Sequence, residues 1–209
     1  MISTKRGVME SVETMWNSKF SCEGYMYGKV PNTFLKEEID TLEPPKKILF
    51  LGEGEGRNAV YAAVKGHEAV ALDVSSVGLK KVEALAKEFD VTIETVHTDL
   101  SEWQPMEEQY DVVMSSYMHL MEPLRTEAFH KAMKALKEGG IFVGEFFSQE
   151  QLSRTSGGPK NLDLLYSVES LQLIFKAYHI VMLEALEIVL NEGTHHVGEA
   201  SVIRVIVKK

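Results

Sequence analysis

Short apolar runs recur along the chain and alternate with segments of helical periodicity. The run at 47–51 is followed at once by Gly52, and a continuous apolar run closed by glycine is typical of a strand buried on both faces of a sheet. Similar runs predict further strands at 68–74, 91–97, 110–116, 141–147, 180–190 and 196–207.

Between these runs the apolar residues recur every three or four positions, which indicates helices. Ser75 or Ser76 can cap one helix and Ser167 another, because a serine hydroxyl accepts from the free N–H groups of a first turn. Pro123 suits a first helical position, and a glycine after the periodic segment ends a helix. The predicted helices are 57–65, the segment that follows Ser75–Ser76, 123–137 and 167–178.

Strands that alternate with helices favour a parallel sheet with helices on both faces and right-handed crossovers. The last two strands are joined only by residues 191–193, and so short a turn requires an antiparallel pair. The sequence therefore predicts an α/β fold, in which a seven-stranded, mostly parallel sheet ends in a C-terminal antiparallel hairpin.

Pro44 and Pro45 divide the chain into two parts. Residues 1–45 are rich in aromatic residues, whose rings need a surface on which to be buried. The carboxyl edge of the predicted sheet offers that surface, so we expect 1–45 to form a lid or cap over a core of 46–209. The length of 209 residues favours a single domain, 1–209.

The charge balance restricts the partners. The formal charge is −9 and no block of Lys and Arg appears, whereas binding to a phosphate backbone or an anionic membrane needs clustered positive charge. We therefore expect neither a nucleic acid nor a membrane as partner. Cys22 is the only cysteine, so an internal disulfide is excluded. Together with the lack of a long apolar stretch, this predicts a cytoplasmic protein.

The sharpest motif lies between the first predicted strand and the first predicted helix. Gly52-Glu53-Gly54-Glu55-Gly56 has three glycines, which let the backbone approach a ligand closely and adopt positive φ. The N–H groups of the loop and of the following helix attract a negative or polar group. A tight turn without a ligand is the alternative, but the carboxyl edge of such a sheet favours a nucleotide-like ligand.

Two carboxylates follow the next strands. Asp73 ends the second strand, where it can accept hydrogen bonds from ribose hydroxyls, and Asp99-Leu100 end the third, near the place of an adenine amino group. A ribose carboxylate suits adenosine in either of two cofactors, so Asp73 does not distinguish them. The dinucleotide fingerprint needs a glycine where this chain has Arg57, which disfavours an NAD-dependent oxidoreductase.

The order of these motifs, with Tyr110-Asp111-Val112-Val113 and Leu136-Lys137-Glu138-Gly139-Gly140, resembles class I S-adenosylmethionine-dependent methyltransferases from about Lys46 to Phe147. Finer motifs, at 27–35, 54–59, 115–120 and 157–166, are similar to tellurite-resistance and thiopurine methyltransferase-like proteins. The resemblance implies a Rossmann-like fold and S-adenosylmethionine as cofactor. It also implies cofactor contacts from Gly52, Glu53, Gly54, Glu55, Gly56, Arg57, Asn58, Asp73, Val74, Ser75, Asp99, Leu100 and Ser115.

Phe50 departs from the family pattern. Many members have an acidic residue two positions before the first motif glycine, where it helps to bind the methionine part of the cofactor. Glu53 or Glu55 can substitute for that acid, and Arg57 can approach the methionine carboxylate.

Candidate acceptor-side residues follow the fourth strand and the N-terminal motif. His119 is the candidate general base because histidine titrates near neutral pH, and a structural histidine is the alternative. Tyr117 and Tyr27 can form an aromatic rim over the methyl group or pack as ordinary core. Asn32 and Arg125 are candidate substrate contacts, although Arg125 at a helix start can equally be solvated.

We expect no metal site, since methyl transfer needs none and the adjacent His195 and His196 point to opposite faces of a strand. The sequence thus predicts methyl transfer to a small-molecule nucleophile such as a thiol or tellurite. A non-catalytic module or partner subunit that binds S-adenosylmethionine or its demethylated product is the alternative. The final hairpin and outer helices also offer surface for a homodimer.

Overall fold

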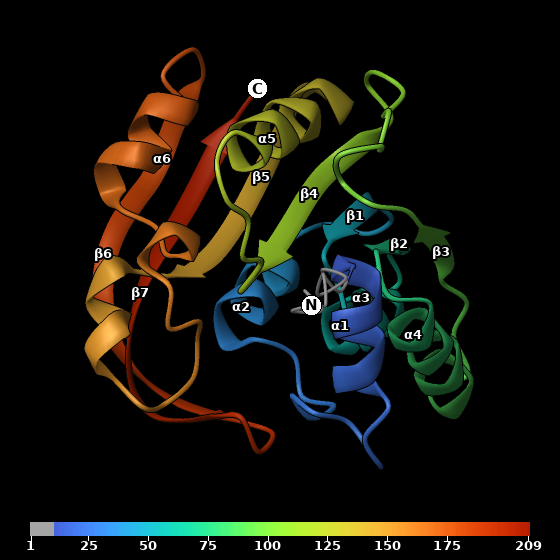
Figure 1. The fold of residues 1–209 in the computed structure, drawn as a ribbon. Coiled ribbons are helices and arrows are strands. Elements are labelled where there is room, and N and C mark those ends of the chain that lie inside the picture. Colours follow the sequence, from blue (N-terminus) through green and yellow to red (C-terminus); the bar gives the residue numbers. More distant parts are fainter. Residues whose placement is uncertain (1–10) are drawn as a thin grey trace, which may run out of the picture.

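The computed structural model describes residues 11–209. A seven-stranded sheet in the order β3-β2-β1-β4-β5-β7-β6 forms the centre, with helices on both faces (Figure 1). Residues 1–10 of the predicted lid lie outside the described part. The strands are β1 (Lys47–Leu51), β2 (Glu68–Asp73), β3 (Glu94–His97), β4 (Tyr110–Ser116), β5 (Leu136–Phe147), β6 (His179–Glu192) and β7 (His196–Lys208).

The strand directions confirm the predicted fold class. β1 pairs in parallel with β2 on one side and with β4 on the other, and β4 pairs in parallel with β5. β7 lies between β5 and β6 and is antiparallel to both. Because the chain continues from β1 to β2 on one side and later to β4 on the other, a crevice opens at the carboxyl end of β1, where such sheets bind ligands.

Helices cover the two faces of the sheet unequally. Apolar side chains of α2, α3 and α4 pack on one face and those of α5 and α6 on the other, while α1 lies against α4 (Figure 1). The helices are α1 (Val12–Phe20), α2 (Thr33–Thr41), α3 (Arg57–Val64), α4 (Ser76–Glu88), α5 (Leu124–Ala135) and α6 (Val168–Ile174), with short 3-10 turns η1 (Gln149–Ser153) and η2 (Leu162–Leu164).

Ser75 and Ser167 cap α4 and α6, as predicted. Other boundaries differ. β5 begins at Leu136, directly after α5, so Gly139–Gly140 lie within the strand and do not precede it. α6 ends at Ile174 and β3 begins at Glu94, so both are shorter than predicted.

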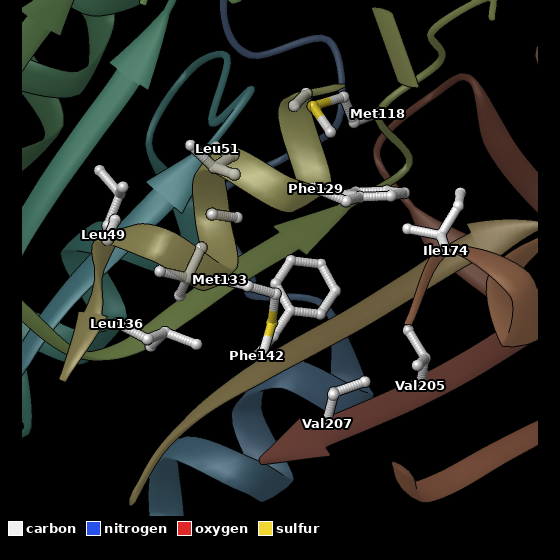
Figure 2. Close-up of a cluster of buried hydrophobic side chains, with 14 of the residues drawn as sticks. Leu49, Leu51, Met118, Phe129, Met133, Leu136, Phe142, Ile174, Val205 and Val207 are labelled. Carbon is white, nitrogen blue, oxygen red and sulfur yellow. The ribbon is translucent and has the colours of Figure 1, made fainter. Parts of the chain in front are cut away.

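The larger core lies between the sheet and α5–α6. Figure 2 shows Phe129 and Met133 of α5 near Phe142 of β5, with Val205 and Val207 of β7 completing the layer. This packing fixes β7 against β5 and thereby sets the position of the final hairpin. No helix within residues 11–209 is both long and apolar enough to cross a lipid bilayer.

Candidate active site

The glycine motif forms the turn from β1 into α3. Gly52, Gly54 and Gly56 have positive φ values of 63°, 66° and 96°, which residues with a side chain rarely adopt. Gly56 is the N-cap residue of α3, and a Cβ there would lie 2.9 Å from the Cα of Val82 in α4. Backbone conformation and close helix packing therefore both require glycine at Gly56.

Glu53 caps the first turn of α3. Its carboxylate accepts hydrogen bonds from the backbone N–H groups of Asn58 (2.8 Å) and Ala59 (2.7 Å), which have no partner within the helix. Burial raises the pKa of Glu53 from 4.5 to about 7, although the N–H of Ala59 and the side chain of Asn58 oppose the shift. Glu53 therefore organises the loop from within.

Glu53→Gln is expected to change how stability depends on pH. Because the folded chain raises the pKa of Glu53 from 4.5 to about 7, the folded state holds this proton more tightly than the unfolded state between those values. The free energy of unfolding of the native chain therefore falls as the pH rises through this window, by up to about 1.4 kcal/mol per pH unit for one proton.

The variant lacks that slope, so its stability relative to the native chain should rise between pH 4.5 and 7 and level off above. Urea unfolding at a series of pH values measures this difference. Glu102→Gln, at an exposed position, is the matched control. A stability difference between Glu53→Gln and the native chain that stays constant across the window would contradict the raised pKa.

Glu55 and Phe50 have structural surroundings. The Glu55 carboxylate accepts hydrogen bonds from the N–H of Met26 (2.7 Å) and from Nζ of Lys81 (2.7 Å), which joins the N-terminal segment to α4. Phe50 is fully buried in the apolar core beneath α2 and α3. Both acids of the motif therefore already have hydrogen-bond partners within the chain.

Asp73 lies beside the glycine motif at the end of β2. Its carboxylate accepts hydrogen bonds from the N–H groups of Gly54 (2.8 Å) and Ser75 (2.7 Å). Burial raises its pKa, and those two N–H groups oppose the shift. A carboxylate can accept about four hydrogen bonds, so two remain for ribose hydroxyls.

Helix α1 covers this end of the sheet (Figure 1). Oδ1 of Asn17 accepts a hydrogen bond from the hydroxyl of Ser75 (2.7 Å), and Glu13 lies 3.2 Å from Nε2 of His97. The ring of Phe20 packs so closely that a Cβ on Gly54 would lie 3.1 Å from it. The N-terminal segment therefore contacts both the glycine motif and the turn after β2.

Other predicted cofactor residues already have partners. The carboxylate of Asp99 accepts hydrogen bonds from the N–H (2.8 Å) and hydroxyl (2.7 Å) of Ser101. The hydroxyl of Ser115 donates to a carbonyl oxygen of β1 at 3.0 Å. Leu100 is buried in the core, and the carbonyl of Val74 is paired with a histidine ring of β3. Asp99 retains a second carboxylate oxygen, whereas Ser115 links two strands.

A second cluster lies on the other side of the glycine motif, around Glu192 at the end of β6. Oε2 of Glu192 accepts a hydrogen bond from Nη2 of Arg57 (3.0 Å) and lies 3.3 Å from Nδ1 of His196. Its Oε1 accepts from Nδ2 of Asn32 (3.2 Å). Burial opposes ionisation of Glu192, but His196 and Arg57 outweigh it and lower the pKa. We call Arg57, Asn32, Glu192 and His196 the hairpin cluster.

Asn32 connects this cluster to a buried carboxylate in β5. Glu145 is 1% exposed, and its Oε1 accepts hydrogen bonds from the hydroxyl of Tyr117 (2.6 Å) and from Nδ2 of Asn32 (2.7 Å). Its Oε2 accepts from Nε of Arg204 (2.7 Å). Tyr117 has a φ of 51°, which is unusual for a residue with a side chain. Such backbone conformations cluster at functional sites.

Tyr27 and His119, two further acceptor-side candidates, lie in different surroundings. The ring centroid of Tyr27 lies 4.6 Å from that of His196, so Tyr27 packs against the hairpin cluster. His119 stacks on Phe147 at 5.8 Å, and its buried Nδ1 has no hydrogen-bond partner within residues 11–209. Burial lowers the pKa of His119 to about 4. Its imidazole is therefore neutral at pH 7.

Arg125 is not presented to a ligand. Its Nε donates to the carbonyl of Leu120 (2.9 Å) and its Nη2 to that of Asp163 (2.6 Å). The guanidinium also stacks on the ring of Tyr166, at 4.2 Å from its centroid. We assign Arg125 a structural role that fixes the loop after β4.

Sequence reasoning missed Glu145, Glu192 and His196. Glu145 is the only charged residue in the apolar run 141–147, and an acid in a doubly buried strand needs a partner. Adjacent strand residues face opposite sides, so one of His195 and His196 had to face inward. His196 is the buried one and His195 is exposed. Glu192 lies in the predicted turn 191–193, where the sequence gives no such indication.

The part of the chain that holds this site is similar to a known protein family. Residues 48–140 match the family model of a methyltransferase domain. The match runs from β1 into β5 and covers less than half of the chain. The matched range holds the glycine motif, Asp73 and the end of β4, and it supports the predicted cofactor class and enzyme class.

Solved structures share the fold of this chain. TehB from Haemophilus influenzae is 16% identical with a TM-score of 0.70 over 86% of this chain, and the match spans 62% of the TehB chain. A protein described in the conversion of a disulfide bond into a thioacetal group during echinomycin biosynthesis is 17% identical, with a TM-score of 0.74 over 95% of this chain and 92% of its own.

A methyltransferase from Methanosarcina mazei is 14% identical, with a TM-score of 0.66 over 86% of this chain and 98% of its own. None of the curated protein sequences matches. At these identities the structural likeness concerns the fold, and the acceptor has to be inferred from the site itself.

The residues of the site fit S-adenosylmethionine as a cofactor. Nη1 of Arg57 is buried and has no partner within residues 11–209, which suits a cation that awaits the methionine carboxylate. Asp73 accepts two backbone N–H groups and keeps acceptor capacity for ribose hydroxyls. S-Adenosylmethionine would supply an electrophilic methyl group, and the chain's own residues position it and the acceptor.

Proposed function

We propose that the chain transfers the methyl group of S-adenosylmethionine to a small-molecule acceptor, with a thiol as the leading class. The observation that carries the proposal is Nη1 of Arg57, which is buried and unpartnered where the glycine motif meets the hairpin cluster. On one side of Arg57 lie the motif and Asp73, which suit the cofactor. On the other side lie polar and aromatic side chains that suit a small acceptor.

A small acceptor also fits the charge of the chain. A formal charge of −9 disfavours nucleic acids, whose phosphates need clustered positive charge. A sulfur acceptor is supported by the fold neighbour described in converting a disulfide into a thioacetal. The subgroup motifs that resemble thiopurine and tellurite-resistance methyltransferases point to soft nucleophiles as well.

The proposal gives each half of the site a task. Asp73 accepts from the ribose hydroxyls, Asp99 and Leu100 lie at the adenine, and Arg57 meets the methionine carboxylate. The acceptor lies against residues of the second half, namely Tyr27, Asn32, Tyr117 and His119. Positioning the two reactants and excluding water supplies most of the rate increase, because the leaving sulfide is already neutral.

Calorimetric titration of the full chain with S-adenosylmethionine, S-adenosylhomocysteine and NAD tests the cofactor side. Binding of both sulfur compounds without binding of NAD is expected. Product detection with 2-mercaptoethanol and with tellurite then tests the acceptor. Binding without turnover of any acceptor would favour a non-catalytic module, and failure of both sulfur compounds to bind would refute the proposal.

Deleting residues 1–30 is expected to weaken cofactor binding and turnover. The deletion removes Phe20 from Gly54 and Asn17 from Ser75, which exposes the cofactor side to water. Titration with S-adenosylmethionine and a turnover assay measure the effect. Phe20→Ala is the smaller matched change, and its loss should be partial. Unchanged affinity and turnover after the deletion would show that this segment is no lid.

A further inference from the structure

His119 and His196 both pack against Phe147, but only His196 also has a carboxylate partner. His196 begins β7, and its Nδ1 lies 3.3 Å from Oε2 of Glu192, the residue that ends β6. Both side chains are largely buried, at 6% and 10% exposure. A carboxylate in this place accepts a hydrogen bond from Nδ1–H, which keeps the proton on Nδ1 and the lone pair on Nε2, the arrangement of an oriented general base.

Aromatic rings hold the His196 imidazole on several sides. Its ring centroid lies 4.6 Å from that of Tyr27, 4.7 Å from Tyr117 and 5.2 Å from Phe147. These rings come from three separate parts of the chain. An imidazole packed in this way has one orientation, so the direction of its Nε2 is fixed by the fold.

The Nε2 edge of the ring faces the loop after β5. Nε2 makes no hydrogen bond within residues 11–209, whereas Nδ1 has Glu192. A Cβ on Gly157 would lie 2.7 Å from Cδ2 and 3.4 Å from Nε2 of His196. The φ of Gly157 is 135°, a conformation that favours glycine, and the closeness of the His196 ring also leaves no room for a side chain. A side chain at position 157 would therefore crowd the Nε2 edge of the ring.

Glu192 also connects His196 to the cofactor side. Its Oε2 is shared by Nδ1 of His196 and Nη2 of Arg57, and Nη1 of Arg57 is the buried atom without a partner. One carboxylate thus orients both the residue proposed for the methionine carboxylate and the histidine. His119, by contrast, has no carboxylate on its buried Nδ1.

We propose that His196 is the proton acceptor of this methyltransferase, that Glu192 is its positioning residue, and that the acceptor is a neutral thiol protonated at neutral pH. The assignment rests on the proposed function. The thiol proton passes to Nε2 of His196, and a sulfur electron pair forms the bond to the methyl carbon. The carbon–sulfur bond of the donor breaks with its electron pair on the donor sulfur, and Glu192 stabilises the imidazolium.

The charges around His196 suit this role. Burial lowers its pKa, Glu192 opposes the shift, and Arg57 and His195 add to it. His119, Tyr27 and Tyr117 also face the ring. Burial thus holds the pKa of His196 below its usual value, and Glu192 is the group that favours the protonated ring.

Two thiols separate proton acceptance from a structural role. 2-Mercaptoethanol is protonated at pH 7, whereas 4-nitrothiophenol is already ionised and needs no base. His196→Gln should lower kcat/KM for 2-mercaptoethanol about 100-fold and for 4-nitrothiophenol less than about threefold. His195→Gln, the exposed neighbour, is the matched control and should change neither. An equal loss on both thiols, or a thiol-dependent loss in His119→Gln alone, would overturn the assignment.

A measurement that does not depend on turnover tests the pairing of His196 with Glu192 independently. In the 15N-labelled native chain, imidazole nitrogen shifts should show His196 with its proton on Nδ1, and Glu192→Gln should raise the Nε2–H fraction. A native ring protonated on Nε2 would overturn the proposal even if His196→Gln does not fold. If neither thiol is methylated while S-adenosylmethionine binds, the thiol class in the proposed function fails, and the nitrogen shifts still decide whether His196 is an oriented base.

Discussion

Glu145→Ala is expected to lower the free energy of unfolding by about 3–5 kcal/mol, since it removes one partner of a buried ion pair. Glu145 is 1% exposed and holds Arg204 at 2.7 Å, together with the hydroxyl of Tyr117 and the amide of Asn32. The change leaves the Arg204 charge and two hydrogen-bond donors without their acceptor. For a chain of this length the loss corresponds to a fall in Tm of roughly 6–20 °C.

Urea unfolding and calorimetry measure this loss. Glu187→Ala is the matched control, because Glu187 lies in β6 and forms an exposed ion pair with Arg154. It should change stability by less than about 1 kcal/mol. Glu145→Gln keeps an acceptor for Tyr117 and should fall between the two. Equal stability of Glu145→Ala and Glu187→Ala would show that the buried network contributes little.

Gly56→Ala is expected to destabilise the chain by about 2–5 kcal/mol and to weaken S-adenosylmethionine binding about tenfold or more. The φ of Gly56 is 96°, which strains any side chain, and the added Cβ would lie 2.9 Å from the Cα of Val82. Backbone cannot move aside as a flexible side chain can, so α3 must shift away from α4. The start of α3 is part of the proposed cofactor site.

Gly66→Ala separates the effect of the left-handed backbone from that of the close contact between α3 and α4. Gly66 has nearly the same φ, 91°, but its added Cβ would meet only Pro44 at an ordinary 3.7 Å. It should cost about 1–2 kcal/mol for the left-handed backbone alone and leave cofactor affinity unchanged. If the two variants lose the same stability and affinity, the close approach of α3 and α4 is not what requires glycine at Gly56.

The strands could be predicted because buried parallel strands are continuous apolar runs. β1 and β4 have the predicted bounds, and the antiparallel hairpin followed from the short connection before β7. α1 could not be predicted, because only Phe20 in it is buried and its periodicity is weak. Contacts with α4 and with the turn after β2 hold it instead.

The proposed cofactor half of the site could be inferred from local motifs, because its residues follow one another along the chain. The hairpin cluster was not, since Glu192 is 135 residues from Arg57 and 160 from Asn32. Arg125 shows the reverse case: an arginine after β4 suggested an anion site, but distant backbone carbonyls and a ring engage it. Side-chain partners of this kind depend on the tertiary fold, which a local pattern does not contain.

The position of β7 between β5 and β6 affects the order in which the molecule can be completed during synthesis. A nascent chain that has reached β6 has made the glycine motif, Asp73 and five strands that can pair, yet β6 has no neighbour until β7 follows. The ribosome releases residues in sequence order, so the part proposed to bind the cofactor can fold first. His196, and with it the contact that holds Glu192, is added only with the last strand. A partly made chain can therefore form the proposed cofactor site before it has the proposed acceptor site.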